Sequence, residues 1–157
     1  MGKKHFVAAV LLGAAVSVAT PLAASAAGGG TEHFTLVFNS ETGPGSIFAS
    51  GAFTAGGTDY QGHSTDEAVF ADGAFKIHHA HVKGTSKFDA KTCTGHQGGS
   101  GPYKIDGGYG AYAGIKASGT AHLNGTIETG RSANGKCNFH DITAYSLIVH
   151  ASGPVSL

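Results

Sequence analysis

The chain has 157 residues, and its ten Lys and Arg balance its ten Asp and Glu, so the formal net charge is zero at pH 7. With a single Arg and no basic cluster, it lacks the electrostatic footprint of a nucleic-acid-binding protein. There is also no Gly-x-Ser-x-Gly nucleophile elbow, which argues against one large class of hydrolases.

The first 26 residues read as a signal peptide. Two lysines open the chain, an apolar run covers residues 6–19, and Ala24-Ser25-Ala26 supplies a small-x-small cleavage site. The apolar run is too short for a membrane-spanning helix. We therefore expect cleavage after Ala26, secretion with no remaining membrane segment, a flexible start at residues 27–31, and one domain over residues 32–157.

The two cysteines, Cys93 and Cys137, both lie in the part expected to be exported. An even pair in an oxidising compartment is typical of a structural disulfide. Neither cysteine has a base near it in sequence that would activate a catalytic thiol. We predict one disulfide between them.

The first half of the chain contains short segments with strand character between turn signals. Residues 33–38 alternate between apolar and polar positions, and residues 39–45 carry Gly43-Pro44-Gly45. Strands are expected at 46–54 and 65–71, while residues 58–64 are compatible with strand, bend or loop. Asp72-Gly73 is a hairpin signal, and we expect one return strand over residues 74–86.

In the second half, a glycine-rich stretch at 95–101 is expected to bulge or lose regular pairing, and residues 102–106 to recover strand character. From Ile115 to Glu128 the chain then alternates strictly between small or apolar residues and polar ones, which is typical of a strand with one dry face. A turn at 130–135 and a strand at 136–151 complete the pattern. One short helix near residues 109–113 is compatible with the sequence.

Turn-punctuated strands without a convincing amphipathic helix predict an all-β fold. An antiparallel barrel of about eight strands leaves no exposed sheet edges and suits the number of segments. The alternative is a two-sheet β-sandwich. Periodicity alone does not choose between them.

Candidate site residues are polar side chains that share a strand face with apolar ones. His79 and His81 have the same parity as Phe75 and Ile77, so they are expected to point inward near one end of a strand. Two imidazoles at this spacing can share a metal ion, but the third ligand is not evident. We keep metal binding as the weaker alternative to a polar lining for an organic ligand, and we expect no cofactor.

The same parity argument adds two tyrosines. Tyr103 shares a face with Ile105, and Tyr145 shares one with Leu147 and Val149. A buried phenol needs a hydrogen-bond partner. Together with His79 and His81, these tyrosines are the candidates for the polar end of a mostly apolar cavity.

One stretch resembles a known family. Gly107-Gly108-Tyr109-Gly110-Ala111-Tyr112-Ala113-Gly114, followed by Ile115 and Ser118-Gly119-Thr120, is similar to the signature of the allene oxide cyclase barrel-like families, which include the dirigent proteins. The match is nearest to small secreted bacterial members of unassigned role. The resemblance implies a calycin-like closed barrel. Because some members of these families form homo-oligomers, it also implies that copies of this chain can associate.

The family also implies a function. Its members with known roles hold a small hydrophobic molecule in the barrel, and the enzymes among them act as isomerases or cyclases by positioning it. No catalytic residue is carried over to this chain. We therefore expect a secreted barrel that binds a small hydrophobic molecule, with possible steering of its cyclisation or isomerisation. The alternative is a secreted structural or interaction module with a filled core.

Overall fold

The structure is a computed structural model that describes residues 29–80 and 82–157, and this part of the chain contains nine strands and no helix. The strands are β1 (Gly30–Phe38), β2 (Gly45–Gly51), β3 (Ala55–Tyr60), β4 (Thr65–Phe70), β5 (Gly73–His79), β6 (Lys83–Asp89), β7 (Thr94–Gly110), β8 (Lys116–Arg131) and β9 (Cys137–Ser156). The all-β prediction is confirmed.

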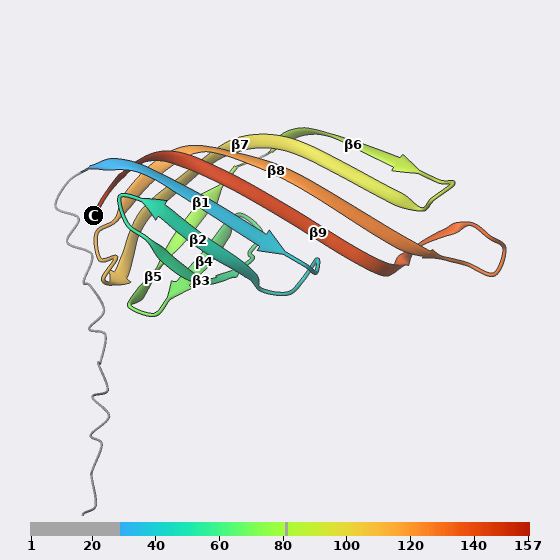
Figure 1. Ribbon diagram of the computed structural model, residues 1–157, viewed down its shortest axis with the longest axis horizontal. Helices are drawn as coiled ribbons and strands as arrows, with labels where there is room; N and C mark the ends of the chain where they lie inside the picture. Colours follow the sequence, from blue (N-terminus) through green and yellow to red (C-terminus); the bar gives the residue numbers. More distant parts are fainter. Residues whose placement is uncertain (1–28, 81) are drawn as a thin grey trace, which may run out of the picture.

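Eight of these strands close into an antiparallel barrel (Figure 1). The sheet order is β5-β4-β3-β2-β1-β9-β8-β7-β6, and a further pairing of β5 with β7 joins the two sides. The sixth strand, β6, lies outside this closed ring. The predicted barrel of about eight strands is therefore confirmed, and the sandwich alternative is wrong.

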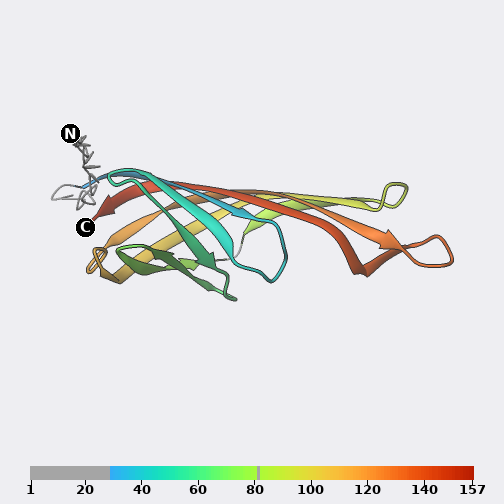
Figure 2. The same cartoon turned by 60° about the horizontal axis from the view of Figure 1, so that its bottom comes forward.

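Three strands are much longer than the barrel needs. In β7, residues 103–110 pair with β5, whereas residues 94–100 pair with β6. In β9, the pairing with β1 stops where Phe38 meets Leu147. The surplus lengths form a four-stranded extension, which we call the wing: β6 with residues 94–101, 121–131 and 137–146 (Figures 1 and 2).

One end of the barrel, which we call the closed end, is filled by aromatic rings. Tyr112 stacks within 5.1 to 5.4 Å of the centroids of Phe53, Phe70 and Phe75, and Phe34 lies 5.8 Å from Phe75. All five side chains are at least nine-tenths buried. Such edge-to-face and tilted aromatic pairs add to the stabilisation from area burial.

The signature stretch builds this closed end. It forms the turn between β7 and β8, where Gly110 and Gly114 have φ values of 66° and 84°, a conformation that glycine adopts most easily. A Cβ on Gly108 would lie 2.5 Å from the Ala74 carbonyl oxygen. The turn is therefore tight enough to direct Tyr112 into the barrel.

The structure corrects several expected elements. The return strand at 74–86 is two strands, because β5 leaves β7 after His79 and β6 begins at Lys83. Residues 95–101 pair continuously within β7, since their glycines fit between the backbones of β6 and β8. Residues 109–113 end a strand and enter a turn, so the short helix is wrong.

The disulfide prediction is confirmed. Cys93 and Cys137 are bonded, with their Cα atoms 5.5 Å apart, and the bond links the turn before β7 to the start of β9 at the far end of the wing. Arg131 supports the same region by donating hydrogen bonds to the carbonyl oxygens of Lys91 and Gly135. Covalent and polar links thus hold the tip of the wing together.

The expected signal peptide, residues 1–26, lies outside the described residues. Part of the stretch expected to be a flexible start is described, and there Gly30 and Thr31 belong to β1, paired with Val155 and Pro154 of β9. The strand thus begins two residues before the expected start of the domain.

Candidate functional site

The end of the barrel opposite Tyr112 is hollow. It holds a cavity of about 330 Å³, which we call the mouth pocket. Most of its wall is apolar, and the lining residues are Phe34, Leu36, Phe38, Gln61, Gly62, Asp66, Ile77, His79, Val82, Tyr103, Ala121, Leu123, Leu147, Val149 and Ala151. Pockets for small molecules span about 300 to 1,000 Å³ and combine such walls with a few polar groups.

A carboxylate and an imidazole form the polar side of the mouth pocket. Asp66 on β4 and His79 on β5 lie with Oδ1 and Nε2 3.2 Å apart, and the Gly62 amide donates to the same Oδ1 at 2.9 Å. Asp66 points inward, since the residue directly opposite it on β5 is Ile77, which is buried. The pair is only partly buried, so it is within reach of a molecule in the pocket.

Tyr103 forms part of the pocket wall nearer the closed end. Its side chain is 4% exposed, and its hydroxyl has no hydrogen-bond partner among the described residues. Burial and, to a smaller extent, the nearby Glu32 carboxyl raise the pKa of Tyr103. Burial thus favours the uncharged form of the Tyr103 phenol.

Two further carboxyl groups lie inside the barrel. Glu32 accepts a hydrogen bond from the Phe53 amide through Oε2, while Oε1 has no partner among the described residues. Asp59 on β3 is fully buried, and both of its oxygens lack a partner there. Burial, with a smaller contribution from Asp66, raises the pKa of Asp59 to about 7.

The structure brings two of the four candidate residues together. His79 and Tyr103 are cross-strand neighbours on β5 and β7, and both line the mouth pocket. Tyr145 faces the same side of the sheet but lies on the wing, because β9 continues beyond the end of β1. His81 lies outside the described residues.

Among residues 29–80 and 82–157, no group of three or more His, Cys, Asp or Glu is placed to hold an ion. The metal alternative itself involves His81, which lies outside the described residues, so it stays a prediction. The polar neighbour of His79 is Asp66.

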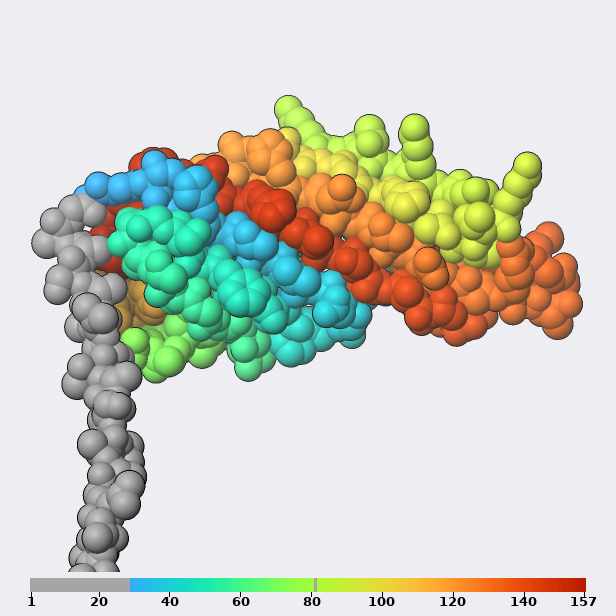
Figure 3. Space-filling model, viewed as in Figure 1, coloured from blue at the N-terminus to red at the C-terminus, as the bar shows by residue number. Residues whose placement is uncertain are grey.

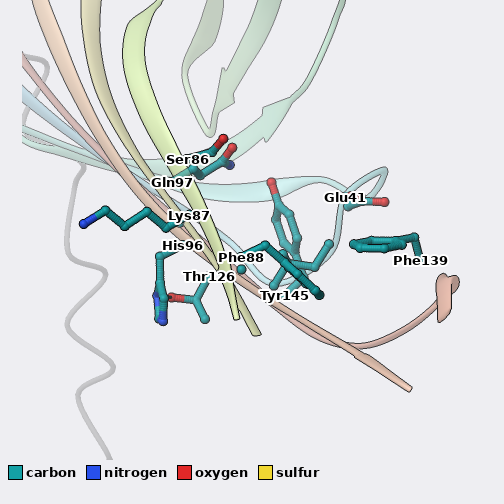
Figure 4. A pocket seen from close by; sticks show the side chains of 12 residues that line it. Glu41, Ser86, Lys87, Phe88, His96, Gln97, Thr126, Phe139 and Tyr145 are labelled. Atoms are coloured by element: carbon teal, nitrogen blue, oxygen red, sulfur yellow. Dashed lines mark hydrogen bonds between the residues drawn. The ribbon is translucent and has the colours of Figure 1, made fainter. Parts of the chain in front are cut away.

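A second hollow, the wing groove, lies on the inner face of the wing and has a volume of about 420 Å³. Phe88 and Phe139 pack there with ring centroids 4.8 Å apart, although Phe139 is 63% exposed. Tyr145 stands in the middle of the groove, and His96 and Thr126 point away from it (Figure 4). This groove holds no inward-facing cluster of carboxylates like that of the barrel.

Figure 3 shows the face of the molecule over which β9, β8 and β7 run side by side toward the tip of the wing. The outward-pointing residues of these strands are mostly polar. His122 of β8 and His150 of β9 are directly opposite each other, and His150 Nδ1 lies 3.2 Å from the Thr35 hydroxyl oxygen. These exposed side chains make ordinary surface contacts, so the outer face offers no enclosed site.

Sequence reasoning missed the three inward carboxyl groups, although the parity of Glu32 and Asp66 was a usable signal. Glu32 alternates in step with Phe34 and Leu36, and Asp66 in step with Phe70. Acidic residues are rarely buried, so an acidic residue on the apolar face of a strand is unusual and indicates a special role. That signal would have identified Glu32 and Asp66 beside His79.

None of the described residues forms a helix of the length and apolarity needed to cross a membrane. Comparisons with models of protein families, with curated proteins and with solved structures gave no significant match. Fold and site define a closed eight-stranded barrel with one filled end, one open end and a wing.

Proposed function

We propose that this is a secreted protein that binds one small hydrophobic molecule in the mouth pocket. The observation that carries the proposal is the asymmetry of the barrel interior: aromatic rings fill the closed end, and a cavity of about 330 Å³ with a mostly apolar wall occupies the other. Burying apolar ligand surface there would contribute about 25 cal/mol per Å² before the costs of association. The disulfide fits an oxidising compartment.

The proposal assigns binding and no reaction. A pocket that holds a reactive molecule in one conformation could also steer its cyclisation or isomerisation, which is what the family resemblance implies. The polar groups on its wall, Asp66 with His79 and the free Tyr103 hydroxyl, would then orient the molecule.

Filling the pocket tests this proposal. Ala121 lines the mouth pocket on β8, and Ala121→Phe should weaken binding of the uncharged fluorescent probe N-phenyl-1-naphthylamine at least tenfold, because the new ring takes up the cavity. Probe fluorescence during a titration measures the affinity. Thr120→Phe adds the same ring one residue away on the outer face and should leave the affinity unchanged. Equal affinity in all three proteins would contradict the proposal.

The second candidate function is an interaction module, and the wing groove is the observation that favours it. Its inner face exposes Phe139 and part of Phe88, next to the edge of β9 at residues 137–146, which no described strand pairs with on the β1 side. Exposed strand edges are a common route to association. Under this alternative, no small molecule binds at the mouth pocket and the wing carries the function.

A further inference from the structure

The interior of the barrel carries three carboxyl groups but no Lys or Arg among the described residues. Asp66 lines the mouth pocket, whereas Asp59 and Glu32 are fully buried in the barrel and are not among the lining residues. By contrast, every Lys and Arg in residues 29–80 and 82–157 is exposed on the outside. Low-dielectric walls lined by one sign of charge concentrate the field in a cleft.

The polar atoms left unsatisfied in this interior are mainly acceptors. Asp66 uses Oδ1 for Gly62 and His79, while its Oδ2 makes no hydrogen bond among the described residues. Asp59 has two free oxygens, and the fully buried Glu32 has one. The Tyr103 hydroxyl, nine-tenths buried in the pocket wall, is unpartnered as well. Of these residues, Asp66 and Tyr103 line the mouth pocket. A carboxylate only accepts hydrogen bonds, so a ligand that donates one fits the free oxygen of Asp66.

An anionic ligand fits poorly. Its charge would lie next to Asp66 in a cavity whose lining contains no Lys or Arg, and like charges at close range disfavour binding strongly. A protonated amine supplies both the missing positive charge and up to three donors in one group.

We infer that the ligand of the mouth pocket is an apolar amine, that is, a hydrocarbon body with one protonated amino group. This inference rests on the proposed function. The amino group binds the free oxygen of Asp66, whose other oxygen lies 3.2 Å from His79. The hydrocarbon body packs against the apolar wall formed by Leu36, Leu147 and Val149.

A matched series of eight-carbon ligands tests the inference on the unaltered protein. 1-Octylamine, 1-octanol and octanoate have the same chain and differ in the charge of the head group. Displacement of N-phenyl-1-naphthylamine at pH 7.5 should rank octylamine at least tenfold tighter than octanol, with octanoate weakest. The inference would be overturned if octanoate or octanol bound as tightly as octylamine. Either result would still establish the pocket itself.

Failure of the proposed function has a different signature, since then neither the uncharged probe nor any of the three ligands binds. That outcome overturns the inference as well.

A variant tests whether Asp66 causes the preference for the amine. Asp66→Asn keeps the shape and removes the charge, so octylamine affinity should fall at least tenfold to that of octanol, whose own affinity stays the same. Glu67→Gln is the matched control, because it removes the same charge from the next residue, which lies opposite Tyr60 and Lys76 on the outer face. An unchanged preference in Asp66→Asn would assign the selectivity to another group and overturn the inference. If that variant does not fold, the ranking on the unaltered protein still decides.

Discussion

Replacing both cysteines of the disulfide, Cys93→Ala with Cys137→Ala, should lower the free energy of unfolding by roughly 4 kcal/mol. The bond closes a loop with a sequence separation of 44 residues, so without it the unfolded chain gains conformational freedom. Alanine suits the Cys93 position, where the side chain is 1% exposed. Denaturant unfolding of the variant and of the parent protein measures the difference.

Hydrogen exchange in the same variant locates the effect. The bond holds the tip of the wing, so amides of β6 and of residues 137–146 should lose protection before those of β1 and β2. Reducing the parent protein with a thiol is the control and should reproduce the loss. A loss below 1 kcal/mol, or exchange that rises first in the barrel, would contradict this role for the bond.

The second large effect concerns Asp59 and pH. Its pKa in the folded protein is about 7, compared with an ordinary value of 3.8, because burial disfavours the charged form. Between these values the folded state holds a proton that the unfolded chain releases. The contribution of Asp59 to stability is therefore fully present below pH 3.8 and is lost as the pH rises through about 7. Asp59→Asn should remove this decline and raise the stability at pH 8 by on the order of 3 kcal/mol.

Denaturant unfolding at pH 5 and at pH 8 measures this change. Asp106→Asn is the matched control: Asp106 is exposed and its pKa is lowered by Lys104, so its removal should leave the trend between pH 5 and 8 unaltered. If Asp59→Asn is as sensitive to pH as the parent protein, Asp59 does not carry an uncompensated charge.

Much of the barrel was predictable because its strands follow a period of two. The alternation from Ile115 onward predicts the inner and outer faces of β8, and the structure buries Ile115 and Ala117 while exposing Lys116 and Ser118. The wing was not predictable. Alternation shows which way a side chain points, but it does not show where a partner strand ends, as β1 does opposite Leu147.

The same limit explains what was and was not found at the site. Parity placed Tyr103 and His79 on the inner face, and pairing across β5 and β7 makes them neighbours. Parity also placed Tyr145 on the inner face, but its position beyond the end of β1 puts it in the wing groove. Asp59 was missed because the strand that carries it, β3, contains Gly56-Gly57, which reads as a break in the sequence.

The central claim is that the mouth pocket is the binding site, and methyl NMR during a titration with 1-octanol tests it most directly. The account predicts saturable shifts of the methyl groups that line the pocket, namely Leu36, Ile77, Leu123, Leu147 and Val149. Methyl groups at the closed end, in the wing groove and on the outer face, namely Ile115, Ile127 and Ile148, should not move. Shifts confined to Ile127, or no shifts at any concentration, would contradict the claim.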